Sequence, residues 1–103
     1  MQRNFDKPFL DLRGSTVPSE IAGQPITLAV IATNALSTTL PTDESLSGKE
    51  RIDLISLAVR ITEGGVREYS VAELATILRR TEKTSSHLGL YRMDELINTP
   101  EAE

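Results

Sequence analysis

Two helix-start signatures of the same type constrain the fold of this chain more than any other feature. Ser47 is followed three residues later by Glu50, and Ser70 is followed three residues later by Glu73. In such a capping box the serine hydroxyl accepts a hydrogen bond from a free backbone N–H, and the glutamate accepts one from the backbone N–H of the serine. Because an apolar run follows each box, the pattern predicts two consecutive helices that begin directly after the two serines.

Apolar spacing and turn residues define the first two helices. Thr27 is predicted to cap a helix that ends at a Ser-Thr-Thr cluster over residues 37–39. The second helix is expected over residues 48–62, and Gly64 and Gly65 end it by supplying positive φ without a steric cost. Its apolar residues cover more than one stripe, so we expect it to be the central buried helix.

The third and fourth helices follow the second capping box. The third is expected to end at a polar break over residues 81–86, and the sequence from Asn98 to Pro100 stops the fourth. The side chains expected to be buried in the third helix are Val71, Leu74, Ile77 and Leu78. The residues at helical spacing in the fourth are Leu88, Tyr91 or Arg92, Leu96 and Ile97.

Residues 1–26 follow a different pattern. Short apolar and charged stretches alternate up to Leu12, Gly14 follows in a turn sequence, and proline and glycine recur up to residue 25. This pattern predicts a short β-hairpin with its turn around Gly14. The extended segment over residues 66–69 is a candidate strand to pair with this hairpin.

These elements combine into an α+β fold, a small helical bundle of three to four helices with a short N-terminal β-hairpin. The length of 103 residues is typical of a single domain. We expect residues 1–103 to form that domain, with the hairpin arm at 1–26 and the helical part at 27–98.

Composition excludes several classes of function. The chain has no cysteine, so disulfides and thiolate chemistry are excluded. The net charge of −4 weighs against non-specific nucleic-acid binding, which depends on a basic surface. The longest apolar run, Leu28–Ala32, is far too short to span a bilayer, and no apolar segment of the signal-peptide type follows Arg3. We therefore expect a cytoplasmic protein that has no membrane partner.

No arrangement of side chains in the sequence predicts catalysis. His87 is the only histidine, and Ser85 and Ser86 are too close to it in sequence for the usual base–nucleophile arrangement. The sequence also has no metal-ligand spacing and no phosphate-binding glycine loop, so we expect no enzyme activity, no cofactor and no metal site. The neighbouring carboxylates Asp43 and Glu44 are explained by solvation of a polar loop and by the dipole of the next helix.

Residues 70–97 allow one alternative function, a helix-turn-helix that binds DNA. A small residue, Ala75, lies where the first helix of such a motif packs closely on the second. The side chains expected to face the major groove are Ser85, Ser86, His87 and Arg92, and those expected near phosphates are Arg79, Arg80 and Lys83. Against this interpretation, the polar turn has no glycine and is longer than three or four residues. Arg79 and Arg80 are also explained as dipole partners at the end of the third helix.

Three segments of the chain occur together in a known group of proteins. Residues 25–36 contain Pro-Ile-Thr-Leu and Asn-Ala-Leu, residues 46–61 contain Leu-Ser-Gly-Lys-Glu before an aliphatic helix, and residues 70–97 contain an acidic-capped helix that leads to Leu-Ile. In order and spacing these segments resemble small proteins of tailed bacteriophages and prophages, a group without a firmly assigned activity. The resemblance implies a non-enzymatic accessory protein in the cytoplasm of a bacterial host. Its expected partner is a phage structural protein or a host protein, and its expected process is head or tail morphogenesis.

A protein contact of this kind needs an exposed surface, and the sequence offers one candidate. It combines the edge of the predicted hairpin, which is able to add a strand to a partner, with the fourth helix. Its residues are Phe5, Phe9, Leu10, Leu12 and Tyr91. Exposure of the aromatic residues together indicates an interface, whereas their burial makes them core filler. The sequence sets neither the identity of the partner nor the oligomeric state.

Overall fold

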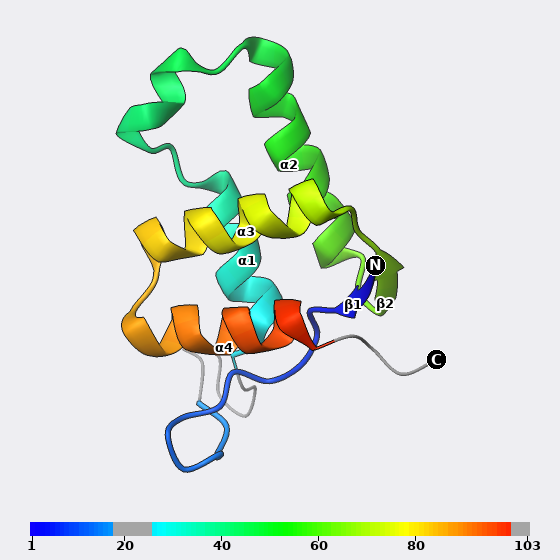
Figure 1. The fold of residues 1–103 in the computed structure, drawn as a ribbon, viewed down its shortest axis with the longest axis vertical. Coiled ribbons are helices and arrows are strands. Elements are labelled where there is room, and N and C mark those ends of the chain that lie inside the picture. The colour runs from blue at the N-terminus through cyan, green and yellow to red at the C-terminus, as the bar shows by residue number, and fades with distance from the viewer. Residues whose placement is uncertain (18–25, 100–103) are drawn as a thin grey trace.

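Four α-helices make up most of the computed structural model, which describes residues 1–17 and 26–99 (Figure 1). In chain order the elements of these residues are β1 (Gln2–Asn4), α1 (Leu28–Ser37), the 3₁₀ helix η1 (Pro41–Ser45), α2 (Gly48–Thr62), β2 (Val66–Glu68), α3 (Val71–Thr84) and α4 (His87–Asn98). The predicted α+β class, a small helical bundle with short antiparallel β-structure at the N-terminus, is confirmed.

Both capping boxes predicted from the sequence are present. The Glu50 N–H donates to the Ser47 hydroxyl at 3.1 Å, and the Glu73 N–H donates to the Ser70 hydroxyl at 3.0 Å. In return, each glutamate accepts a hydrogen bond from the backbone N–H of its serine. The two boxes therefore fix where α2 and α3 begin. Val71, which was predicted to be buried, is 69% exposed because it lies at the first position of α3, before the helix enters the core.

The two strands pair parts of the chain that are far apart in sequence. β1 runs antiparallel to β2, so the pairing expected for the segment after α2 is confirmed. The predicted turn is also present, since Gly14 has a φ of 81° and Leu10 and Thr16 form a single antiparallel bridge across it. Beside the sheet, Arg3 Nε donates a 2.9 Å hydrogen bond to the carbonyl of Ile97, which ties β1 to the end of α4.

The core is centred on α1, which contacts α2, α3 and α4. Aliphatic side chains fill most of it, and two aromatic rings complete it. Phe5 and Tyr69 are each 2% exposed and lie edge to face, with their ring centroids 5.2 Å apart. The predicted interaction surface included Phe5, and that part of the prediction is wrong because the Phe5 ring lies in the core.

The expectation that the second helix is the central buried one is also wrong. α2 lies at one edge of the molecule, with the other helices on one side of it (Figure 1). One stripe of α2 is buried in the core and consists of Leu57, Ala58 and Ile61. A second apolar stripe is exposed and consists of Ile52, Ile55 and Val59. The doubled apolar pattern therefore marks a helix with an inner and an outer apolar face, and α1 takes the central position.

The polar residues after Arg80 continue α3, contrary to the predicted break. The hydroxyl of Thr81 donates to the carbonyl of Ile77 at 2.7 Å, and the hydroxyl of Thr84 donates to the carbonyl of Arg80 at 2.9 Å. Because both hydroxyls are satisfied within the helix, they do not end it. The link between α3 and α4 therefore shortens to two residues.

A glycine allows this short link to pack closely. Gly89 is buried in the first turn of α4, and its N–H donates to the hydroxyl of Ser86 at 3.1 Å. A Cβ at this position would lie 1.9 Å from the hydroxyl oxygen of Ser85 and 3.1 Å from its Cβ. A larger residue at position 89 therefore has to displace the side chain of Ser85.

Candidate interaction sites

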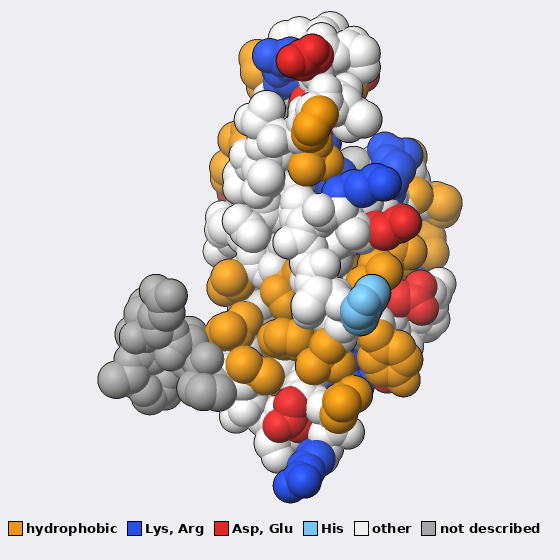
Figure 2. Space-filling model, turned by 90° about the vertical axis from the view of Figure 1, so that its left-hand side faces the viewer, with side chains coloured by type: hydrophobic (Ala, Val, Ile, Leu, Met, Phe, Trp, Pro, Cys, Tyr) orange, Lys and Arg blue, Asp and Glu red, His pale blue; other side chains and the backbone are white. Residues whose placement is uncertain are grey.

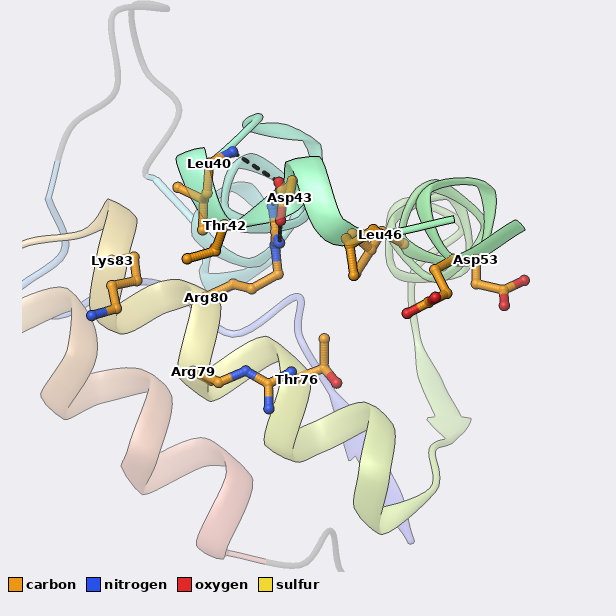
Figure 3. A pocket seen from close by; sticks show the side chains of 11 residues that line it. Leu40, Thr42, Asp43, Leu46, Asp53, Thr76, Arg79, Arg80 and Lys83 are labelled. Atoms are coloured by element: carbon orange, nitrogen blue, oxygen red, sulfur yellow. Dashed lines mark hydrogen bonds and ion pairs between the residues drawn. The ribbon is translucent and has the colours of Figure 1, made fainter. Parts of the chain in front are cut away.

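Asp43 and Arg80 form a buried ion pair that joins η1 to α3 (Figure 3). Two guanidinium nitrogens donate to the two carboxylate oxygens at 2.8 and 2.9 Å. Arg80 also donates to the carbonyls of Ala35 and Thr38 at the end of α1, and Asp43 accepts from the N–H of Leu40. Sequence analysis expected a solvated Asp43 and an Arg80 near phosphates or at the helix dipole. Both expectations are wrong, because the two side chains satisfy each other in the interior.

The ion pair fixes the protonation state of the carboxylate. The hydrogen bonds from Arg80, followed by that from the Leu40 N–H, favour the charged form and lower the pKa of Asp43 to about 2. A carboxylate with so low a pKa accepts a proton poorly near neutral pH, so Asp43 is not suited to act as a general base. Its role is to hold the end of α1, η1 and α3 together.

A cleft of about 490 Å³ opens beside this pair, between η1, α2 and α3. Its lining includes Glu50 and Asp53 from α2 and Arg79 and Lys83 from α3. Lys83 lies at the end of the cleft that is far from Asp53 (Figure 3). Among the described residues no ion pair joins these four side chains to one another, and the ion pair that links α2 to α3 is that of Arg60 with Glu73, at 2.8 Å. The cleft therefore has acidic residues on its α2 side and basic residues on its α3 side. The carboxylate of Asp43, which also lines it, is already paired with Arg80.

Arg92 connects α4 to the loop over residues 10–16, which the bridge between Leu10 and Thr16 closes around the turn at Gly14. Its Nε donates to the carbonyl of Leu10 at 3.0 Å, and a terminal nitrogen donates to the carbonyl of Asp11 at 2.5 Å. The guanidinium carbon lies 5.4 Å from the centroid of the Tyr91 ring. Arg92 therefore fixes the loop beside Tyr91, whereas sequence analysis expected this side chain to face DNA.

Two of the five residues of the predicted interaction surface, Leu10 and Tyr91, take part in these contacts, and Phe9 and Leu12 are next to the contacted residues in sequence. Leu12 is 87% exposed and Tyr91 is 59% exposed, whereas Phe9 and Leu10 are half-buried. Figure 2 shows hydrophobic side chains gathered around the histidine on the face that holds the α3–α4 link. We call Phe9, Leu10, Leu12 and Tyr91 the loop–α4 surface. The structure thus exposes Leu12 and Tyr91 next to the residues of the Arg92 contacts, packs Phe9 partly against the core, and removes Phe5 from the surface.

The other residues predicted to contact DNA lie around the α3–α4 link. Ser86 caps α4, His87 is exposed at its first position, Ser85 is half-buried in the link, and Arg79 and Lys83 are exposed on α3. Side by side, α3 and α4 run in opposite directions (Figures 1 and 3). The helices of a DNA-binding helix-turn-helix cross at about 90–120°. The arrangement is therefore that of an antiparallel helical hairpin.

A surface that sequence analysis did not identify is the outer face of α2. Ile52, Ile55 and Val59 are 67%, 47% and 51% exposed. Together with Arg51 and Ser56 they line a shallow pocket of about 520 Å³. The signal was present in the sequence as a second apolar stripe, but the pattern alone does not distinguish a buried helix from one with an exposed apolar face.

Some classes of site are absent from the part of the chain that the structure describes. Among these residues, no group of three or more His, Asp or Glu side chains is arranged to hold a metal ion. Within residues 1–17 and 26–99, no helix is both long enough and apolar enough to cross a membrane. No protein-family model, curated protein or solved structure matches the chain.

Proposed function

We propose that this protein is a non-enzymatic interaction module that binds a partner protein through the loop–α4 surface. The observation that carries the proposal is the exposure of Leu12 and Tyr91 next to Arg92, which joins the loop to α4. Large apolar side chains that are exposed close together are typical of binding sites. Tyrosine is also one of the residues most enriched at the energetic centres of protein interfaces.

The contacts of Arg92 favour binding because they order the loop before a partner arrives. Its guanidinium holds two loop carbonyls, and its side chain is only 15% exposed. A surface that is already ordered loses less conformational entropy on association. In this proposal Arg92 orders the loop through its hydrogen bonds, and the side chains of Tyr91 and Leu12 contact the partner.

The class of partner follows from charge and from the sequence resemblance. Arg80 and Arg92 are used within the chain, which leaves few cations near the α3–α4 link for phosphates and favours a protein partner over DNA. The resemblance to small phage proteins supports a virion or host protein as the partner and morphogenesis as the process.

The test is affinity purification of the tagged protein from bacteria that carry its gene, with and without nuclease, followed by mass spectrometry. Three forms are compared: wild type, a double variant Leu12→Ser with Tyr91→Ala, and a control Val71→Ser. Val71 is as exposed as the tested residues but lies at the opposite end of α3 from the link.

We expect one protein to co-purify in stoichiometric amount with the wild type and the control, and to be lost with the double variant. Its recovery has to be independent of nuclease. A partner that the double variant retains, or one released by nuclease, would overturn the proposal, and release by nuclease would favour the DNA-binding alternative.

A further inference from the structure

The outer face of α2 carries the repeat of a short coiled-coil seam. Ile52, Ile55 and Val59 have the spacing of consecutive a, d and a positions in a heptad, and all three are exposed. Coiled-coil helices pair by inserting such side chains between those of a partner helix. The inner face of α2 is occupied by the core, so this seam is free to meet a helix from outside.

We propose that α2 packs antiparallel against α2 of a second copy of this chain, across a twofold axis near Ser56. In this arrangement each Ile55 lies against Val59 of the other copy, and each Ile52 lies against Thr62 of the other copy. A twofold interface uses the same patch on both chains, so the patch has to be complementary to itself. The seam meets this condition because the layer of Ile55 with Val59 occurs twice, once on each side of the axis.

The charges beside the seam select the antiparallel orientation. Lys49 and Glu63 are seam-flanking positions of the same heptad type, near opposite ends of α2. Antiparallel pairing places Lys49 of each chain next to Glu63 of the other, where the lysine joins the 3.4 Å ion pair that Glu63 makes with Arg67 of its own chain. In a parallel pair each e position faces a g position of the other helix, so Glu63 lies beside Ala58 and Lys49 gains no opposite charge from α2. Charge complementarity thus identifies a second copy as the occupant and fixes its direction.

The size of the seam predicts a weak dimer. The 15 residues of α2 extend for about 22 Å, which is two heptads. A contact along one helix face of this length buries less area than the roughly 800 Å² per partner of a standard interface. We therefore expect a dissociation constant in the micromolar range or weaker. Self-association is therefore concentration-dependent, and it uses a face that is separate from the loop–α4 surface.

Sedimentation equilibrium over a wide concentration series tests the interface. The wild type is compared with Ile55→Glu, which places a charge in the central layer, and with Val71→Glu, a matched change at an exposed β-branched residue outside both the seam and the loop–α4 surface. We expect a monomer–dimer equilibrium for the wild type and the control, and at least a tenfold weaker one for Ile55→Glu. A wild type that is monomeric up to millimolar concentration, or a dimer unaffected by Ile55→Glu, would overturn the proposal.

Charge reversal tests the orientation. Lys49→Glu and Glu63→Lys are each expected to weaken the dimer, and the double variant is expected to restore it, because the ion pairs re-form with exchanged signs. Each single change places a charge that favours its own end of the α2 dipole, so weaker association cannot come from loss of the helix. If the double variant is no tighter than the single variants, the antiparallel arrangement is wrong.

Labelling gives an independent measure of the same geometry, and the chain has no cysteine to interfere. Spin labels at Ser56→Cys should lie close together across the twofold axis. Labels at Lys49→Cys should be separated by about 20 Å along the helix, from 1.5 Å per residue. Short distances at both positions would indicate a parallel pair and contradict the proposal.

Discussion

Arg92 offers a direct test of how the loop–α4 surface is held. The substitution Arg92→Met keeps much of the apolar stem and removes the donors to the carbonyls of Leu10 and Asp11. Hydrogen bonds from charged groups contribute about 1.5–3 kcal/mol each, and water replaces part of what is lost. With two such bonds and a side chain that is only 15% exposed, we expect opening of the loop to become easier by about 2–4 kcal/mol.

Amide hydrogen exchange measures this opening. The N–H of Asp11 donates to Ser15 and the N–H of Val17 donates to Phe9, so both amides report on the closed loop. At about 1.4 kcal/mol per factor of ten, their exchange should accelerate roughly 30- to 1000-fold in Arg92→Met. The amides of α3 serve as an internal reference, because they exchange through opening of the core rather than of the loop.

Two further variants separate the hydrogen bonds from the loss of charge. Arg92→Lys keeps the charge but cannot reproduce the forked geometry, so it should be intermediate. Arg79→Met removes the same charge from an exposed position on α3 and should leave loop exchange unchanged. If the Asp11 and Val17 amides exchange no faster in Arg92→Met than in Arg79→Met, other contacts hold the loop and the reasoning is refuted.

Three other substitutions test the interior. Gly89→Ala should destabilise the wild type by about 1–3 kcal/mol through the contact with Ser85, and the better helix propensity of alanine offsets up to about 1 kcal/mol of this. In a Ser85→Gly background the contact is absent, so the same substitution should stabilise the protein. A double-mutant cycle measured by urea unfolding compares the two effects, and equal effects would contradict the clash. Asp43→Asn should flatten the dependence of the urea midpoint on pH. The pKa of Asp43 falls from 3.8 to about 2 on folding, so the stability that the carboxylate contributes is present above about pH 4 and lost towards pH 2; an unchanged slope counts against the ion pair. Phe5→Ala should cost about 3–5 kcal/mol in thermal unfolding, and a loss under 1 kcal/mol would place Phe5 outside the core.

Local chemistry explains which elements of the fold were predictable. Ser47 and Ser70 set the starts of α2 and α3 through contacts within four residues of the chain. The extended segment after α2 was correctly paired with the N-terminus, because few other segments of the sequence favour strand. The end of α3 was mispredicted because polar side chains such as Thr81 can satisfy themselves on a helix carbonyl as readily as in a loop.

The sites were harder to predict because they depend on contacts between distant residues. Nothing near Asp43 in sequence indicates that Arg80, 37 residues away, neutralises it. Arg92 bonds backbone carbonyls, which every residue has, so its partners leave no signature in the sequence. The exposure of Tyr91 and Leu12 could be proposed from the sequence. The burial of Phe5 could not, because it depends on how the chain after β1 lies on the core.

The pairing of β1 with β2 has a consequence for how the chain folds as it is made. Residue 2 lies opposite residue 68, so β1 has no strand partner until about 66 further residues have been synthesised. At about 5–20 residues per second that delay is roughly 3–13 s, during which α1 and α2 are complete and free to associate. The last helix then supplies the carbonyl that Arg3 binds. β1, which is synthesised before the four helices, is therefore among the last of these elements to reach its native contacts.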